Sequence, residues 1–339
     1  MQEEVCMNKI FTTVLTAGTL AAAGSAHAET YEWTLGYMGV PGMIYTDVAE
    51  VIPERIAKAT DGQVVITANS SLVTPNRLLE AVRDGLVDMS LVVTAYYTGT
   101  QPLFSVPAMP GAVESLENLK AVDASPYGDQ LREVYDADYN SIELMQTAFC
   151  PQTIFSTKPI RTVEECNGRK LRVNNRATGL IGEQLGATTI SLSANEIVPA
   201  LERGVIDGVV TDICWGYNSG ITEVVDYASY WQLGSVMPAP LLVNKSSWDE
   251  LPADLQEKVA AELKQIEADY DIEFQKRADA MPGLLEEKGV EYTAIPEAEM
   301  MRVYSDEVMT PVMDAWREEM SRAGFDADAT MATVNEATK

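Results

Sequence analysis

The side chains that most enzymes use for proton transfer and metal binding are scarce in this chain. Its single histidine, His27, lies in an N-terminal segment with the features of a cleaved leader. Loss of that leader removes histidine general bases, serine–histidine and cysteine–histidine chemistry, and nearly all catalytic zinc sites. Carboxylates are plentiful, but no pair of them stands in a catalytic motif. We therefore expect a protein that is not an enzyme and that holds no cofactor or metal.

Arg172 is the cation whose position most needs an explanation. It stands inside the otherwise apolar strand-like run Lys170–Val173. A planar guanidinium offers two parallel donors to a carboxylate and stays charged when it is desolvated. The alternatives are an internal salt bridge and an arginine on an edge strand. The chemistry that Arg172 predicts is carboxylate binding.

Three cysteines follow the leader, at positions 150, 166 and 214. An oxidising compartment permits one disulfide and leaves one thiol over. Three pairings are possible, Cys150–Cys166 among them, and the sequence does not choose between them. Ordinary buried thiols are the leading alternative.

Residues 7–28 have the parts of a secretory signal peptide. Lys9 supplies a positive charge, and Phe11–Ala23 form an apolar stretch too short to span a bilayer. Ala26 and Ala28 then place small residues at the −3 and −1 positions of a cleavage site. An apolar first helix of the folded protein is the alternative. We expect cleavage after Ala28 and localisation in the periplasm.

The charge balance restricts the partners. The 339 residues include 51 Asp and Glu against 24 Lys and Arg, a formal net charge of −27. This acidity argues against binding to nucleic acid or to anionic lipid. It neither identifies nor excludes an acidic ligand, because one local cation outweighs a diffuse field. The length suits two domains, no later stretch is apolar enough to span a membrane, and we expect a monomer.

The elements that must position these side chains alternate between strands and helices. Such alternation is typical of an α/β fold with parallel sheets and helices on both faces, on which ligands bind at the carboxyl ends of strands. We expect strands at Tyr31–Leu35, Gln63–Ala68, Val87–Thr94, Lys170–Val173, Thr188–Leu192 and Gly208–Asp212, and helices at Tyr45–Thr60 and Arg77–Leu86.

One predicted helix is much longer than the others. Ser247–Glu250 read as a capping box, Pro252 fits a first turn, and an apolar stripe from Leu255 to Phe274 continues towards Pro282. About 28 residues at 1.5 Å each span roughly 40 Å, enough to bridge two lobes. A surface helix is the alternative.

The order and spacing of five sequence blocks are distinctive: Ala57–Val64, Leu79–Met89, Asn167–Val173, Leu185–Ala187 and Glu196–Gly208. Together they resemble the periplasmic solute-binding proteins of tripartite ATP-independent periplasmic (TRAP) transporters, the DctP family. The resemblance extends over essentially the whole chain after the leader. It implies a type II-like periplasmic-binding-protein fold, in which two α/β lobes with mostly parallel sheets and flanking helices are hinged by crossing strands and a long helix. The lobes close over an anionic ligand.

The resemblance also implies domains and partners. We assign residues 1–28 to the signal peptide, 29–149 plus 238–278 to an N-terminal lobe, and 150–237 plus 279–339 to a C-terminal lobe. The implied partners are a small carboxylate ligand and the integral membrane permease subunits of a TRAP transporter, with no nucleic acid. The alternative is an extracytoplasmic sensor that hands a carboxylate to a signalling protein.

In the family, the arginine that binds the ligand carboxylate falls at Arg172. Sialic-acid-type members have a second arginine where this chain has Gln152 and an asparagine where it has Thr211. Val93 and Tyr96 replace a glutamate and an arginine of those members. Neutral and apolar groups would leave the hydroxyls of a sugar acid unsatisfied. The departures therefore predict an organic acid with an apolar or aromatic body.

Further residues are candidates for the rest of the site. Asn174, Asn175 and Thr178 follow Arg172 closely enough to reach a ligand, and Arg176 is either a second cation or a surface residue. Asp212 is interpreted as a cation ligand, a partner for a ligand amine, or a loop cap. The turn Gly36–Met43 lacks nucleotide-binding spacing and is expected to offer backbone donors. Candidate aromatic walls, with core packing as the alternative, are Tyr37, Tyr96, Tyr97, Trp215 and Tyr217.

Overall fold

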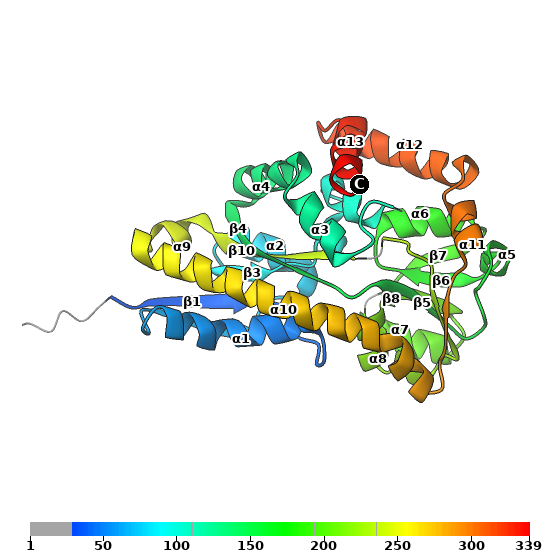
Figure 1. Cartoon of the computed structure of the whole chain (residues 1–339), viewed down its shortest axis with the longest axis horizontal. Helices are drawn as coiled ribbons and strands as arrows, with labels where there is room; N and C mark the ends of the chain where they lie inside the picture. Colours follow the sequence, from blue (N-terminus) through cyan, green and yellow to red (C-terminus); the bar gives the residue numbers. More distant parts are fainter. Residues whose placement is uncertain (1–28, 110, 193, 235) are drawn as a thin grey trace, which may run out of the picture.

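The computed structural model describes residues 29–109, 111–192, 194–234 and 236–339, without the side chain of residue 195. The predicted signal peptide lies outside these residues. Two β-sheets lie one after the other along the long axis of the molecule, each flanked by helices (Figure 1). Among the described residues, no helix combines the length and the apolar content that a bilayer crossing requires.

The first sheet has the strand order β2-β1-β3-β10-β4, and the second has the order β11-β9-β5-β8-β6-β7. The strands of the first sheet are β1 Tyr31–Gly36, β2 Val64–Asn69, β3 Met89–Leu91, β4 Ser141–Ala148 and β10 Pro238–Asn244. Those of the second are β5 Gln152–Ser156, β6 Lys170–Val173, β7 Thr188–Ser191, β8 Gly208–Asp212, β9 Tyr227–Tyr230 and β11 Glu291–Ala294.

Helices cover both sheets. Around the first lie α1 Ile44–Ala59, α2 Leu78–Arg83, α3 Leu116–Asp123, α4 Pro126–Tyr139 and α9 Lys245–Asp249, with the 3₁₀ turns η1 Pro75–Arg77, η2 Thr94–Tyr97 and η3 Pro102–Ala108. Around the second lie α5 Val163–Cys166, α6 Arg176–Gln184, α7 Ala194–Glu202, α8 Ile213–Asn218, η4 Ile221–Glu223 and α11 Glu297–Val303. The remaining helices are α10 Ala253–Glu287, α12 Asp306–Arg322 and α13 Ala327–Ala337.

The fold is α/β as predicted, and both sheets are mixed: five of the nine neighbouring strand pairs are parallel and four are antiparallel. The strands β5 and β10 run antiparallel to their neighbours on both sides. Each follows directly on a strand of the other sheet, β5 on β4 and β10 on β9. A strand that enters a sheet where its neighbours end must run opposite to them. The crossings between the sheets therefore produce the antiparallel pairs.

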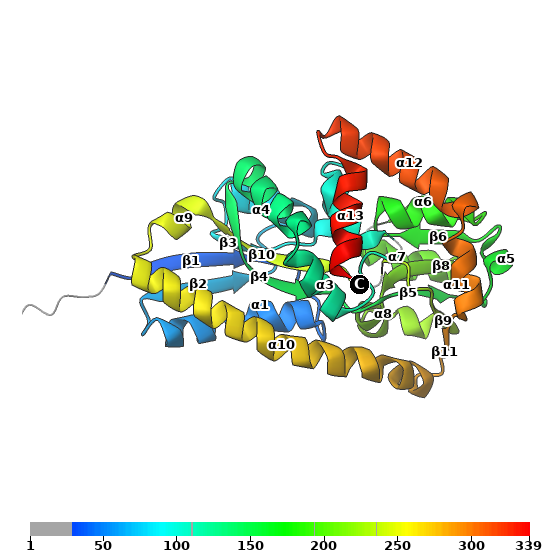
Figure 2. The same ribbon diagram turned by 45° about the horizontal axis from the view of Figure 1, so that its top comes forward.

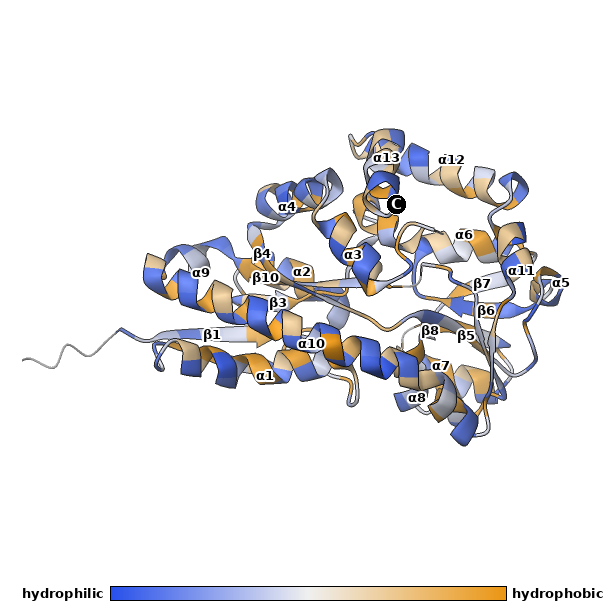
Figure 3. Cartoon of the chain, viewed as in Figure 1, coloured by the Kyte–Doolittle hydropathy of each residue, from blue (hydrophilic) through white to orange (hydrophobic). Residues whose placement is uncertain are grey.

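Helix α10 is a third connection between the sheets and runs along both of them (Figures 1 and 2). Its 35 residues contact α1 and β4 at the first sheet and α8 and β11 at the second. Hydrophilic and hydrophobic residues alternate along it, as a helix with one apolar stripe requires (Figure 3). The stripe buries Leu255, Val259, Leu263, Ile266, Phe274, Met281 and Leu285.

Two details of the predicted long helix are wrong. Ser247 does not cap it: Ser247 lies in the separate short helix α9, where the Asn244 side chain accepts hydrogen bonds from the backbone N–H groups of Ser246 and Ser247. The helix also continues through Pro282 to Glu287. A proline disrupts a helix interior, but here the buried Leu285 anchors the turn that follows it.

A disulfide joins Cys150 to Cys214, whereas Cys166 is a buried thiol. The cysteines are therefore not all buried thiols, and Cys150–Cys166 is the wrong pairing. The antiparallel pairing of β5 with β8 explains the outcome, because it sets Gln152 opposite Asp212. Two residues further out, Cys150 and Cys214 face each other with Cα atoms 5.9 Å apart.

The last two helices fold back over the molecule. Helix α12 contacts α6 and η3, and α13 lies against α3 and α4 (Figure 2). The Trp316 indole N–H donates to the carbonyl of Pro102 at 3.3 Å. The end of the chain thus lies beside helices of the first sheet. The lobe boundaries given above remain a prediction.

Candidate functional site

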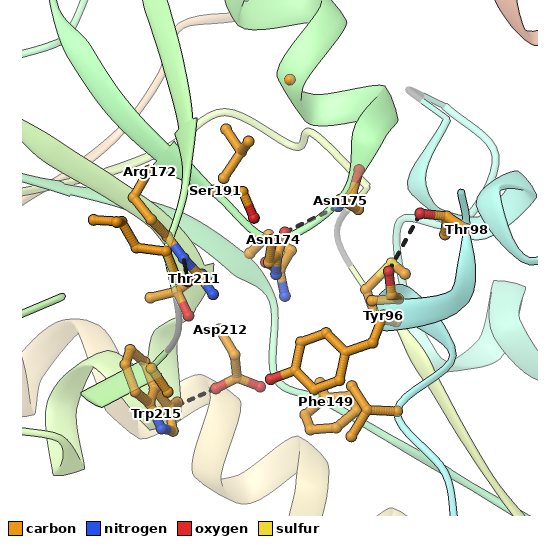
Figure 4. A pocket seen from close by; sticks show the side chains of 18 of the residues that line it. Tyr96, Thr98, Phe149, Arg172, Asn174, Asn175, Ser191, Thr211, Asp212 and Trp215 are labelled. Carbon is orange, nitrogen blue, oxygen red and sulfur yellow. Dashed lines mark hydrogen bonds between the residues drawn. The ribbon is translucent and has the colours of Figure 1, made fainter. Parts of the chain in front are cut away.

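A cavity of about 940 Å³ lies where elements of the two sheets meet. Tyr96, on η2, faces a group of residues from β6, β8 and α8 across this space (Figure 4). Several strands end here: Gly36 ends β1, Val173 ends β6 and Asp212 ends β8. The cavity therefore occupies the carboxyl edge at which α/β sheets bind ligands.

Most of the predicted site residues line this cavity. The turn after β1 adds the side chains of Met38, Val40 and Met43, and the crossing between β4 and β5 adds Phe149. Binding of a ligand by these residues remains a prediction. The predicted residues among the lining are Val93, Tyr96, Gln152, Arg172, Asn174, Asn175, Arg176, Thr211, Asp212 and Trp215.

Arg172 is 5% exposed and lies on β6, which is held between β8 and β7. It is therefore not an edge-strand arginine. Its Nε donates to the carbonyl of Leu192 at 3.2 Å and one terminal nitrogen donates to that of Val210 at 3.3 Å. Within the described part of the chain, no carboxylate lies within salt-bridge distance of this guanidinium.

The cation of Arg172 is thus buried, oriented by two carbonyls and uncompensated by any described carboxylate. Burial lowers the pKa of Arg172, and the nearby Tyr96 phenol opposes that shift. A guanidinium remains charged in proteins, and two of its five donors are used by the carbonyls. The remaining donors are available to an anion in the cavity.

Side-chain amides next to Arg172 form a fixed chain. The Asn174 side chain donates to the side-chain amide oxygen of Gln152 at 2.9 Å, and the Asn175 side chain donates to the amide oxygen of Asn174 at 2.9 Å. Asn175 also caps α6 by accepting from the backbone N–H of Thr178. Gln152 and Asn174 therefore present polar groups whose orientation is set before a ligand arrives.

Asp212 is 4% exposed and lies at the end of β8. Its Oδ1 caps α8 by accepting from the backbone N–H of Trp215 at 2.8 Å. Its Oδ2 is buried and has no hydrogen-bond partner. Burial raises the pKa of this carboxyl to about 7, although backbone N–H groups, that of Trp215 first, oppose the shift.

The surroundings of Asp212 do not form a set of metal ligands. Its carboxylate and the sulfur atoms of Cys150 and Cys214 all lie within 4.8 Å of one another. Both sulfur atoms are joined in the disulfide, however. Thiolates, the form of cysteine that binds metals, are therefore not available there.

Tyr37 and Tyr217, which we predicted as ligand walls, lie outside the cavity lining. Tyr37 is buried and its hydroxyl donates to Glu50 at 3.3 Å, since its neighbour Met38 takes the cavity side of the extended chain. The Tyr217 ring lies under the ammonium of Lys288, 4.5 Å from its centroid. Tyr97 is likewise buried, and its hydroxyl accepts from the backbone N–H of Leu79.

Two backbone N–H groups of the turn Gly36–Met43, which we expected to offer donors to a ligand, are engaged elsewhere. The N–H of Met38 donates to the Tyr45 hydroxyl at 3.2 Å, and that of Val40 donates to the Thr46 hydroxyl at 2.9 Å. These two donors are therefore not available to a ligand, and the turn adds the apolar side chains of Met38, Val40 and Met43 to the cavity wall. It is a wall of the site.

Sequence reasoning missed two residues that line the cavity at the crossings, Phe149 after β4 and Met237 before β10. The backbone N–H of Phe149 donates to the carbonyl of Met237 at 2.9 Å, which holds the two crossings together. Crossing strands between the lobes were predicted. Residues at the ends of these strands could therefore have been predicted to line the cavity.

The family model for bacterial extracellular solute-binding protein, family 7 (DctP) matches residues 39–319. A solute-binding protein of Albidiferax ferrireducens is 29% identical over 205 residues, which are 59% of this chain and 60% of that protein. The C4-dicarboxylate-binding periplasmic protein DctP of Rhodobacter capsulatus is 27% identical over 334 residues, 95% of this chain and 96% of that one.

The fold also matches a solved structure. DctP7 of Bordetella pertussis, an extracytoplasmic solute receptor that binds pyroglutamic acid, superposes with a TM-score of 0.80 at 19% identity. The match covers 91% of this chain and 99% of that one. The predicted family and the two-sheet α/β fold are thereby confirmed. This chain belongs to the DctP family of bacterial extracellular solute-binding proteins.

Proposed function

We propose that this protein is a periplasmic receptor that binds a small organic acid in the cavity between its sheets and delivers it to the permease of a TRAP transporter. The observation that carries the proposal is Arg172, a buried cation in the cavity with no described carboxylate partner. Burying a charge without a partner is unfavourable. A ligand carboxylate supplies that partner and two parallel hydrogen bonds.

The walls of the cavity support an acid with a largely apolar body. Met38, Val40, Met43, Phe149 and Trp215 contribute apolar or aromatic surface around the few polar groups. Sites for small molecules are generally built in this way, with polar groups that fix the orientation of the ligand. DctP7 with pyroglutamic acid and the C4-dicarboxylate-binding relative support the assignment to small acids.

The remaining parts of the proposal follow from the family. DctP is a class of solute-binding proteins rather than of enzymes, and we propose binding without turnover. The relative named as periplasmic supports export, with residues 1–28 as the signal peptide. A sensor would use the same binding physics, and no observation favours it over a transport receptor.

A thermal-shift screen of small carboxylic acids tests the proposal, with the primary amide of each acid as its matched control. A ligand at 100 times its Kd stabilises the folded state by about 2.7 kcal/mol, which raises the melting temperature measurably. We expect shifts with acids, no shifts with the amides, and unchanged acid by NMR after incubation. Equal shifts with an acid and its amide would contradict carboxylate recognition, and consumption of the acid would contradict binding without turnover.

A further inference from the structure

Only one of the two carboxylate oxygens of Asp212 accepts a hydrogen bond. The N–H of Trp215 fixes Oδ1 at 2.8 Å and so sets the direction of the whole carboxyl group. Oδ2 has no hydrogen-bond partner, although the residue is 4% exposed and lines the cavity. A buried polar group without a partner is rare in a folded protein and calls for an explanation.

The other charged side chains of the cavity lining have partners. Arg176 forms an ion pair with Glu319 of α12. Glu183 accepts a hydrogen bond from the Thr189 hydroxyl at 2.8 Å. Among the charged side chains that line the cavity in the described part of the chain, the Arg172 guanidinium has no carboxylate partner and the second oxygen of Asp212 has no hydrogen-bond partner.

Two complementary groups thus face one cavity without compensation, one a set of cationic donors and the other a fixed acceptor. We propose that Asp212 makes this receptor selective for acids that carry a second group able to donate a hydrogen bond, such as an amide or amine N–H, and that it disfavours dicarboxylates. The inference rests on the proposed function, because it assumes that Arg172 holds the carboxylate of the ligand. It adds a requirement at the other end of the ligand.

The physical basis is the difference between a satisfied and an unsatisfied acceptor. A ligand with a donor supplies the missing hydrogen bond to Oδ2, whereas an isostere without one leaves the oxygen buried and unpaired. Above about pH 7, where Asp212 is ionised, a second carboxylate would bring a like charge to it. Sites built to bind a donor group reject analogues that lack it much more strongly than apolar pockets reject a changed shape.

Substitution of Asp212 can separate its cap from its acceptor. In Asp212→Asn the amide oxygen can still accept from the N–H of Trp215, while the amide nitrogen takes the place of Oδ2. The cap of α8 is retained, and an acceptor that faces the cavity becomes a donor. The exposed Asp129→Asn on α4 is a matched control that removes the same charge away from the cavity.

Calorimetry on a pair of ring-shaped acids tests the inference. Pyroglutamate carries a lactam N–H, and its lactone isostere, 5-oxotetrahydrofuran-2-carboxylate, has a ring oxygen at that place. We expect the wild-type protein and Asp129→Asn to bind the lactam about 10- to 100-fold more tightly than the lactone. Asp212→Asn should lose this preference. Above about pH 7, where Asp212 is ionised, succinate should bind the wild-type protein more weakly than the lactam.

The outcomes distinguish this inference from the function on which it rests. Equal affinity of the wild-type protein for lactam and lactone, or a preference that survives in Asp212→Asn, overturns the role of Asp212 and leaves the carboxylate site intact. If the lactam does not bind, the acids found by thermal shift are compared instead, and best binders that lack a donor or are dicarboxylates overturn the inference. A chain that binds no acid refutes the proposed function and this inference together.

Discussion

Replacing Arg172 with alanine should abolish tight binding while leaving the folded protein largely intact. The guanidinium is 5% exposed and donates to the carbonyls of Leu192 and Val210. Truncating one partner of a buried, hydrogen-bonded charge pair costs about 2–5 kcal/mol, which corresponds to a loss of affinity of roughly 30- to several-thousand-fold. The ligand carboxylate would be left in the cavity without its cation.

The stability of the ligand-free protein should change much less than its affinity. The substitution removes two hydrogen bonds, each of which stabilises a protein by about 0.5–1.5 kcal/mol. It also removes a charge whose burial is unfavourable without a partner. These effects oppose each other, so we expect a small shift in the melting temperature without ligand and no further shift when the acid is added.

Isothermal titration calorimetry with an acid from the thermal-shift screen measures the affinity, and two variants provide the comparison. Arg172→Lys keeps the charge but lacks the planar fork, and should bind with intermediate affinity. Arg176→Ala removes an arginine that also lines the cavity but is paired with Glu319, and should change affinity only several-fold. Near-wild-type binding by Arg172→Ala, or a larger loss in Arg176→Ala, would refute the assignment of the carboxylate to Arg172.

Three further predictions concern stability and the effect of pH. Burial raises the pKa of Glu143 to about 8, against the effect of Arg132 at 3.6 Å, so the folded state binds the Glu143 proton more tightly than the unfolded state does. The free energy of unfolding should therefore fall as pH rises from about 4.5 to 8. Denaturant titrations should show a shallower fall in Glu143→Gln, and equal slopes in the two proteins would contradict this cause. The Cys150–Cys214 disulfide closes a loop with a sequence separation of 64, so its reduction or double replacement by serine should lower the free energy of unfolding by about 4 kcal/mol in chemical denaturation, while Cys166→Ser should show no such loss. Trp316 is 2% exposed and joins α12 to Pro102, so Trp316→Ala should destabilise the protein by about 3–5 kcal/mol, and a loss below 1 kcal/mol would show that α12 packs only loosely.

The local elements could be predicted because their signals are local. Lys170–Val173 and Gly208–Asp212 form β6 and β8 with the predicted bounds. The predicted strand Val87–Thr94 is shorter, at Met89–Leu91, because the chain turns into η2 at Thr94. Strand direction was not predictable in this way. The direction of a strand depends on which sheet it enters, and the residues of β5 and β10 do not indicate the sheet.

The candidate site divides along the same line. Arg172 was predictable because a charge in an apolar strand is visible in the sequence and a family motif surrounds it. The sequence does not show which side of the chain an aromatic ring faces. Tyr37, predicted as a ligand wall, lies on the opposite side of the chain from Met38, which lines the cavity. The disulfide likewise depends on the pairing of β5 with β8, two strands far apart in the sequence.

The crossing from β4 to β5 explains why the antiparallel pair β5–β8 and the disulfide lie so close to the site. Strand β5 begins at the cavity, and its neighbour β8 ends there, so antiparallel pairing sets Gln152 opposite Asp212 and Thr153 opposite Thr211. The disulfide locks the same two segments two residues further out. Gln152 and Asp212 thus take their positions from the connection between the sheets. We therefore expect that a substitution that removes the disulfide weakens ligand binding as well as the fold, which calorimetry on the double serine variant measures.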